Sequence, residues 1–165
     1  METTKRWRAG CYLFSVVWLI YIPHADAQES SLLTYALDAA PGSLTVDRMP
    51  TTGPPRQYAQ TFTFTVSNTR RTDYKGSTPS CKTYDVEVFR IEGAARISVW
   101  KWSSGRRFCQ MVTPVNILAG KKWGKVVVWK FKTSDIKDGQ YTALATFEAT
   151  SDKSASTAFQ ISSVQ

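Results

Sequence analysis

The chain has 165 residues, of which 42% are hydrophobic, 13% aromatic and 21% charged. This length and composition are typical of one globular domain, and they exclude a disordered or fibrous chain and most multidomain enzymes. Lysine and arginine outnumber aspartate and glutamate by 21 to 13, but they are scattered in ones and twos. That scatter favours a solvated basic surface over nucleic-acid binding, and we expect no nucleic-acid partner.

Residues 1–27 have the organisation of a secretory signal peptide. Three basic residues within the first eight precede an apolar run from Cys11 to Ile22, and Ala25-Asp26-Ala27 has the small-x-small pattern of a signal-peptidase site. We therefore expect cleavage before Gln28 and a secreted mature chain without membrane contact. The run is shorter than the roughly 20 residues that cross a bilayer. An uncleaved signal anchor is the alternative.

Cleavage at this site would remove His24, the only histidine, and Cys11, one of three cysteines. Without an imidazole the mature chain lacks Ser-His and Cys-His nucleophilic mechanisms, histidine acid-base catalysis and ordinary zinc sites. We expect a protein that is not an enzyme, with no catalytic residue, no metal and no cofactor. The remaining Cys81 and Cys109 are an even pair in an oxidising compartment, which favours a disulfide over two free thiols.

Residues 28–56 are expected to hold an N-terminal strand and a long connection. The strand is predicted near Leu32 to Leu37. The stretch from Ala40 to Arg56 contains four prolines and two glycines. These residues favour a loop over a segment of the core.

From residue 57 to residue 165 the apolar residues recur with the period of two that is typical of strands. Gln60 to Val66 alternates hydroxyl and apolar side chains. Tyr84 to Arg90 alternates as well, which predicts that Asp85 and Glu87 share the solvent face as surface charges. Further strands are predicted at Ile97 to Trp102, Val112 to Leu118, Lys125 to Phe131, Tyr141 to Phe147 and Ala158 to Ile161.

Turn signals separate these segments, and one of them is Gly76-Ser77-Thr78-Pro79. The chain shows no convincing amphipathic helix. About seven short strands at regular spacing therefore predict a single-domain, all-β fold, an antiparallel β-sandwich.

The aromatic residues are concentrated between Val99 and Gln110. In a strand Trp100 and Trp102 project to the same face. One interpretation is that both indoles pack into the sandwich or cover its open end. The other is an exposed aromatic and arginine platform that contacts a partner. We expect Trp100 to be structural and Trp102 to contact a partner.

The same segment carries the pattern W-x-W-S-x-G-x-x-F-x-Q, and through it and its flanking motifs the chain resembles the domain of the bacterial intracellular proteinase inhibitor BsuPI. The resemblance covers roughly Gln57 to Thr150. The residues that carry it are Tyr84-Asp85-Val86, Val99-Trp100-Lys101-Trp102-Ser103, Gly105, Phe108, Gln110, the turn Leu118-Ala119-Gly120, Trp129 and Gly139-Gln140-Tyr141-Thr142.

The resemblance implies an immunoglobulin-like β-sandwich and, by the family name, a proteinase inhibitor. Structural roles are expected for Trp100, Phe108, Gln110, Trp129 and Tyr141. The chain departs from the family in two ways: the namesake is cytoplasmic, and position 109 holds Cys where the family usually has Thr. A Cys81–Cys109 bridge would tie the segment before Tyr84 to the end of the tryptophan segment.

The expected function is that of a secreted, non-catalytic binding domain whose partner is a protein, with inhibition of a serine proteinase as its most concrete form. A disulfide-anchored turn could present a basic side chain to the acidic specificity pocket of a trypsin-like enzyme. Solvated loop arginines are the alternative at this turn. The alternative function is an extracellular structural or adhesive module that contacts protein or glycan through aromatic residues. The candidate contact residues are Trp102, Ser103, Ser104, Gly105, Arg106 and Arg107.

Overall fold

The computed structural model describes residues 33–48, 56–150 and 153–164. The expected signal peptide, residues 1–27, lies outside these ranges, as do residues 49–55 of the predicted connection. Most of the described residues lie in β-strands. The strands are β1 (Leu33–Ala40), β2 (Ser43–Asp47), β3 (Gln57–Asn68), β4 (Tyr74–Thr78), β5 (Tyr84–Glu92), β6 (Ala95–Lys101), β7 (Thr113–Ile117), β8 (Lys122–Lys132), β9 (Gly139–Phe147) and β10 (Ser154–Val164).

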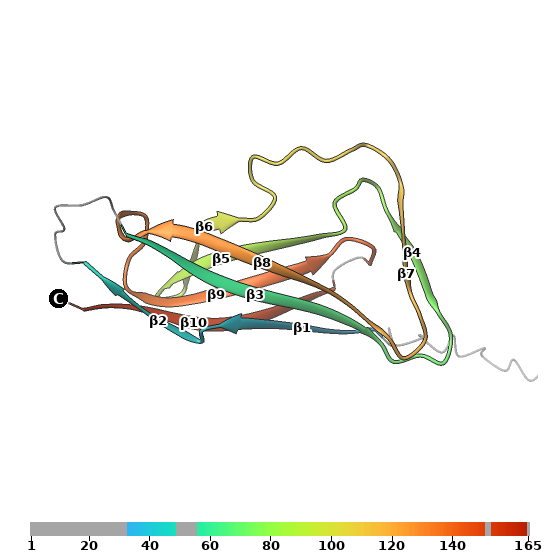
Figure 1. Cartoon of the computed structure of the whole chain (residues 1–165), viewed down its shortest axis with the longest axis horizontal. Helices are drawn as coiled ribbons and strands as arrows, with labels where there is room; N and C mark the ends of the chain where they lie inside the picture. The colour runs from blue at the N-terminus through green and yellow to red at the C-terminus, as the bar shows by residue number, and fades with distance from the viewer. Residues whose placement is uncertain (1–32, 49–55, 151–152, 165) are drawn as a thin grey trace, which may run out of the picture.

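Two sheets face each other across the core (Figure 1). One has the order β1-β3-β8 and the other the order β2-β10-β9-β5-β6. Every pair in these sheets is antiparallel except β2 with β10, which is parallel. A separate ribbon of β4 and β7 stands at one end of the sandwich. Within the described ranges the only helix is a 3-10 turn at Thr133–Asp135, and no helix there is long and apolar enough to cross a membrane.

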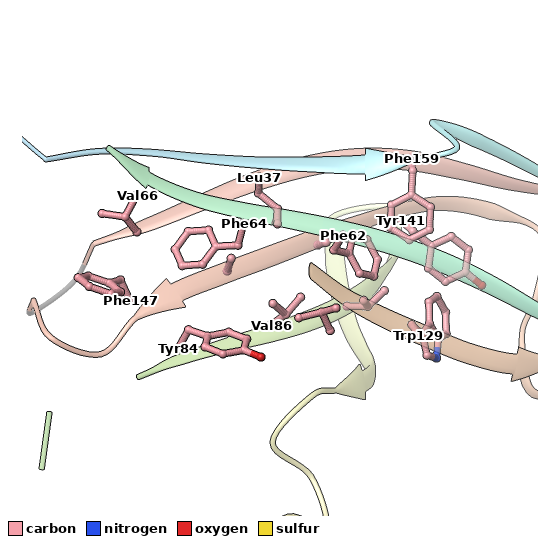
Figure 2. Packing of buried hydrophobic residues seen from close by; sticks show 14 of the residues in the cluster. Leu37, Phe62, Phe64, Val66, Tyr84, Val86, Trp129, Tyr141, Phe147 and Phe159 are labelled. Carbon is pink, nitrogen blue, oxygen red and sulfur yellow. The ribbon is translucent and has the colours of Figure 1, made fainter. Parts of the chain in front are cut away.

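The core is built from the apolar side of each alternating strand. On β3 the rings of Phe62 and Phe64 and the side chain of Val66 are fully buried, while the threonines between them point outward. Across the sandwich, Phe159 of β10 meets Phe62 edge-on at 5.6 Å between ring centroids. Figure 2 shows these side chains converging from both sheets. Burial of apolar side chains at roughly 1.5–3 kcal/mol each therefore holds the two layers together.

Tyr141 marks this sandwich as immunoglobulin-like. It is fully buried near the start of β9, and its hydroxyl donates a hydrogen bond of 2.5 Å to the backbone oxygen of Lys137. A buried tyrosine that bonds back to the backbone a few residues upstream is the tyrosine corner of immunoglobulin-type domains. Its ring also stacks on Phe159 at 5.5 Å and lies 6.1 Å from Trp129. The predicted all-β, immunoglobulin-like sandwich is confirmed.

The prediction of a loop for the whole stretch from Ala40 to Arg56 is wrong. Strand β2 lies within it, and Val46 of that strand is fully buried in the core. The strand forms because its backbone pairs in parallel with β10, from Ser43 opposite Gln160 to Asp47 opposite Val164. The prolines flank this short segment, so their composition hid a strand that depends on a distant partner.

The turn predicted at Gly76-Ser77-Thr78-Pro79 is also corrected, because residues 76–78 belong to β4. They pair with β7, with Thr78 opposite Thr113. Gly76 lies directly beside the Tyr74 ring. A Cβ at this position would lie 2.3 Å from the Tyr74 hydroxyl oxygen, so the tyrosine ring occupies the space that any side chain would need.

Candidate functional site

Residues 102–107 form a tight double turn after β6, which we call the tryptophan turn. The Trp102 backbone nitrogen donates to the Val86 oxygen at 2.8 Å, which continues the pairing of β6 with β5 for one residue. The Ser104 nitrogen then donates to the Lys101 oxygen, and the Arg106 nitrogen to the Ser103 oxygen, each at 3.1 Å. Gly105 has a φ of 72°. Side chains other than glycine seldom adopt this conformation, so Gly105 allows the chain to reverse.

Asp85 of β5 anchors the turn through hydrogen bonds. It accepts hydrogen bonds from the Ser103 hydroxyl at 2.6 Å, from the Ser103 backbone nitrogen at 3.2 Å and from the Val86 backbone nitrogen at 2.9 Å. Asp85 is 6% exposed, so its prediction as a surface charge is wrong. A carboxylate buried at this position is stabilised by these donors and by a neighbouring lysine.

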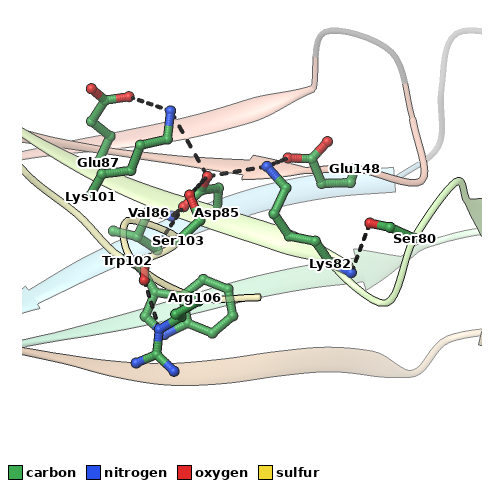
Figure 3. A network of polar contacts seen from close by, with 10 residues as sticks. All are labelled: Ser80, Lys82, Asp85, Val86, Glu87, Lys101, Trp102, Ser103, Arg106 and Glu148. Atoms are coloured by element: carbon green, nitrogen blue, oxygen red, sulfur yellow. Dashed lines mark hydrogen bonds and ion pairs between the residues drawn. The ribbon is translucent and has the colours of Figure 1, made fainter. Parts of the chain in front are cut away.

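Two lysines and three carboxylates form a network around Asp85 (Figure 3). Lys82 Nζ lies 3.2 Å from Asp85 Oδ2 and 2.8 Å from Glu148 Oε1. Lys101 Nζ lies 3.1 Å from Glu87 Oε2. Burial opposes the charge on Lys82, but hydrogen bonds to Glu148 and Asp85 outweigh it and raise the pKa of Lys82 above its ordinary value. The lysine therefore stays charged and holds the segment before β5 against the end of β9.

Trp102 packs its indole between other side chains. Its ring stacks on Tyr84 at 4.3 Å between centroids and lies 5.7 Å from the Phe108 ring. Arg106 covers it, with Cζ 4.6 Å above the ring, and its Nε donates to the Trp102 backbone oxygen at 2.7 Å. Burial raises the pKa of the Tyr84 hydroxyl, although the nearby charge of Arg106 opposes the shift. Arg106 is therefore folded back on the turn by a cation-π contact.

Trp100 serves a different purpose from Trp102. Its half-buried ring lies 6.5 Å from the Phe62 ring of β3 and 6.1 Å from the Trp129 ring of β8, nearly parallel to both. It thus joins the edge strand β6 to the opposite sheet. Trp129 itself is buried in the core.

A disulfide between Cys81 and Cys109 connects the tryptophan turn to the segment before β5. The two Cα atoms are 5.3 Å apart, and the Cys81 nitrogen donates to the Cys109 oxygen at 3.2 Å. Both cysteines are exposed. Beside this bridge lies an open cleft of about 680 Å³. Its lining residues are Pro79, Ser80, Lys82, Ser103, Arg106, Arg107, Phe108 and Gln110.

The cleft brings together only some of the predicted contact residues. Ser103, Arg106 and Arg107 line it, whereas Trp102 packs against Tyr84, and the exposed Ser104 and Gly105 do not line the cleft. The cleft also includes Phe108 and Gln110, which were expected to be structural.

Sequence reasoning missed the residues on the other side of the cleft, Pro79, Ser80 and Lys82, and the anchor Asp85. One available signal was the position of Asp85 within the Tyr84-Asp85-Val86 motif of the family pattern. Another was the expected bridge at Cys81, which brings its sequence neighbours to the turn. Within the described residues, no group of three or more histidine, cysteine, aspartate or glutamate side chains could hold a metal ion.

Asp85→Ala is expected to lower the free energy of unfolding by about 2–3 kcal/mol, because it leaves buried donors of Ser103 and Val86 without an acceptor. Urea unfolding followed by circular dichroism measures the change. The matched control is Glu87→Ala, which removes a more exposed ion pair with Lys101 and is expected to cost about 1 kcal/mol or less. Equal costs for the two variants would contradict the anchoring role of Asp85.

The chain matches the family described as BsuPI, intracellular proteinase inhibitor, over residues 46–152. The match includes the end of β2, strands β3 through β9, the tryptophan turn, both cysteines and the cleft. The protein belongs to this family, which is named for inhibition of proteinases. No curated protein matches the chain.

Several solved structures resemble the chain weakly. A Pseudomonas fluorescens alkylpurine DNA glycosylase, AlkC, bound to DNA has a TM-score of 0.45 at 10% identity over 80% of this chain and 31% of its own. A β-glucosidase from Erythrobacter marinus has a TM-score of 0.41 at 15% identity, and the match covers 78% of this chain and 15% of the glucosidase. The CARDB domain of a Pyrococcus furiosus protein has a TM-score of 0.40 at 14% identity, and the match covers 81% of this chain and 94% of the CARDB domain. The chain thus spans about a third or less of the first two proteins, and these likenesses carry no functional argument.

Proposed function

We propose that this protein is a secreted, non-catalytic domain that inhibits a proteinase by binding it through the tryptophan turn. Support comes from the family, whose description is that of a proteinase inhibitor. The observation that carries the proposal is the way the turn is held. One end is tied by Asp85, the other by the Cys81–Cys109 bridge, and the exposed residues lie between them. A loop that is rigid before binding loses little conformational entropy on binding.

The two arginines of the turn have different contacts, which sharpens the proposal. Arg106 is held against the Trp102 ring. Arg107 is exposed, and it forms no hydrogen bond or ion pair with the residues that the structure describes. Arg107 is therefore the side chain that we propose for the acidic specificity pocket of a trypsin-like serine proteinase.

The test is titration of the purified protein against a panel of serine proteinases. We expect stoichiometric loss of activity for an enzyme that cleaves after basic residues. Arg106→Ala with Arg107→Ala should weaken inhibition, with Arg107→Ala alone accounting for most of the loss. Arg107→Ala should change stability by no more than about 0.5 kcal/mol, whereas the double variant also loses the contacts of Arg106 with Trp102 and should cost about 1 kcal/mol. Arg71→Ala, an exposed arginine outside the cleft, is the control.

Unchanged inhibition by the double arginine variant would place the contact on another edge of the sandwich. The absence of inhibition across the whole panel would overturn the proposal and favour the alternative, a structural or adhesive module. Against that alternative, the tryptophans of the Val99–Gln110 segment pack on other rings of the fold, Trp100 on Phe62 and Trp102 on Tyr84.

Export is part of the proposal, although the family is described as intracellular. It is supported by the disulfide between two exposed cysteines, because such bridges persist in oxidising compartments and are rare in the cytosol. We expect the mature protein to begin at or within a few residues of Gln28. N-terminal sequencing of the protein from the medium of expressing cells tests this. Soluble cytoplasmic protein that retains Met1 would contradict export.

A further inference from the structure

The cleft beside the disulfide is shallow and open to solvent, so a ligand would lie across it and remain partly exposed. Its volume is about 680 Å³. One side is the segment Pro79–Lys82 and the other is Ser103–Gln110, and the Cys81–Cys109 bridge fixes their separation. The cleft is therefore formed before any ligand arrives, which favours binding.

The charges that line the cleft are all positive. Lys82, Arg106 and Arg107 line it, and no carboxylate does. Lys82 is already paired with Asp85 and Glu148, so it offers little free charge. Arg106 uses its Nε for the uncharged Trp102 oxygen and has no carboxylate partner in the described chain. With Arg107, it provides two guanidinium groups that no carboxylate of the described residues neutralises.

Carboxylates near the cleft reduce its positive electrostatic potential. Lys82 is paired with Asp85 and Glu148. Lys101 is paired with Glu87 and also lies near Asp85. This network therefore has three carboxylates and two lysines. Arg106 and Arg107 outweigh its excess negative charge by one. The carboxylates are directed to their own lysine and serine donors, whereas the two guanidinium groups are available to a ligand. Guanidinium groups bind carboxylates through paired hydrogen bonds.

The cleft also offers an apolar surface. Phe108 is half-buried against Trp102, and Pro79 lies among the lining residues of the facing segment. A ligand that joins an apolar body to a single carboxylate fits both features. Phosphate alone would use only the charge.

We propose that this cleft binds a carboxylate of a peptide, supplied either by the chain end or by an acidic side chain, with Arg107 and Arg106 as donors and Phe108 as the apolar contact. In this binding mode the cleft holds the ligand, whereas in proteinase inhibition Arg107 enters a pocket of the enzyme. Carboxylate binding therefore does not require that the protein inhibit a proteinase. Because Arg107 takes part in both, a bound carboxylate should compete with a proteinase at the tryptophan turn.

The test uses small probes and the full mature protein, observed through backbone amide NMR shifts. For the chain end, N-acetylphenylalanine is compared with its uncharged amide. For the side chain, N-acetylglutamate α-amide is compared with N-acetylglutaminamide. We expect at least one carboxylate probe to bind about tenfold more tightly than its neutral counterpart, with shifts at Ser103, Phe108 and Gln110. The tighter of the two carboxylates identifies the source.

Arg107→Gln should weaken binding of the preferred probe about fivefold or more, and added salt should weaken it further. Arg71→Gln is the matched control and should bind as the unchanged protein does. Equal binding of charged and neutral probes, no binding of any probe at millimolar concentration, or full binding by Arg107→Gln would each overturn the inference. None of these results depends on whether a proteinase is inhibited, so the two proposals fail separately.

Discussion

Trp100→Ala is expected to lower the free energy of unfolding by about 3 kcal/mol, the lower end of the range of roughly 3–5 kcal/mol for truncating a buried tryptophan. The lower end applies because the ring is half-buried. Its loss removes the stacking contacts with Phe62 and Trp129 and leaves a gap between β6 and the facing sheet. This is a large share of the roughly 5–15 kcal/mol that stabilises a domain.

Urea unfolding followed by far-ultraviolet circular dichroism measures the effect without relying on the fluorescence that the mutation alters. Ile97→Ala is the matched control, because Ile97 lies on the same strand and is 37% exposed. It should cost well under half as much. Trp100→Phe should recover part of the loss by restoring a ring between Phe62 and Trp129. A Trp100→Ala cost no greater than that of Ile97→Ala would show that the indole does not join the sheets.

The strands that could be predicted from sequence are those whose own side chains alternate. Residues Gln60–Val66 carry the period of two within one segment, and β3 forms around them. Strands β2 and β4 could not be predicted in this way. Each has only five residues, and each forms because β10 or β7 supplies the hydrogen bonds. Pairing with a distant segment leaves little local signal in a short strand.

Asp85 shows a second limit of sequence patterns. Alternation places it on the same side of β5 as Glu87, and on that basis both are surface charges. The tryptophan turn folds over only one end of that face, however, and covers Asp85 while Glu87 remains partly exposed. Burial of a strand residue thus depends on which loop crosses it. The predicted cysteine pair and aromatic turn lie beside the candidate cleft, whereas its facing segment and the role of Asp85 are evident only from the tertiary structure.

Removal of the disulfide by Cys81→Ser with Cys109→Ser is expected to cost about 3–4 kcal/mol on the chain-entropy account of a loop of this length. The cysteines are 28 residues apart in sequence. The loop between them contains β5, β6 and the tryptophan turn. Without the bridge, the unfolded chain gains freedom, while the native turn keeps its hydrogen bonds to Asp85.

Two measurements check this expectation. The intact mass of the unchanged protein should lie about two daltons below that of the dithiol form, because a disulfide forms with loss of two hydrogens. Dithiothreitol should then lower the stability of the unchanged protein to that of the double serine variant and leave the variant unaffected. Alkylation of both cysteines without prior reduction, or a variant as stable as the unchanged protein, would contradict a stabilising bridge.

The disulfide variant also separates the stability of the fold from the geometry of the cleft. A loss of about 3–4 kcal/mol leaves a domain of ordinary stability folded, so the variant should keep its strand content. Among the described residues, Asp85 with its partners and the backbone hydrogen bond from Cys81 to Cys109 would then still join the segments Pro79–Lys82 and Ser103–Gln110. We expect the folded variant to bind the preferred carboxylate probe more weakly, because part of the binding energy must reorder the cleft. A folded variant that binds as tightly as the unchanged protein would show that Asp85 and the backbone hydrogen bond hold the site in place without the disulfide.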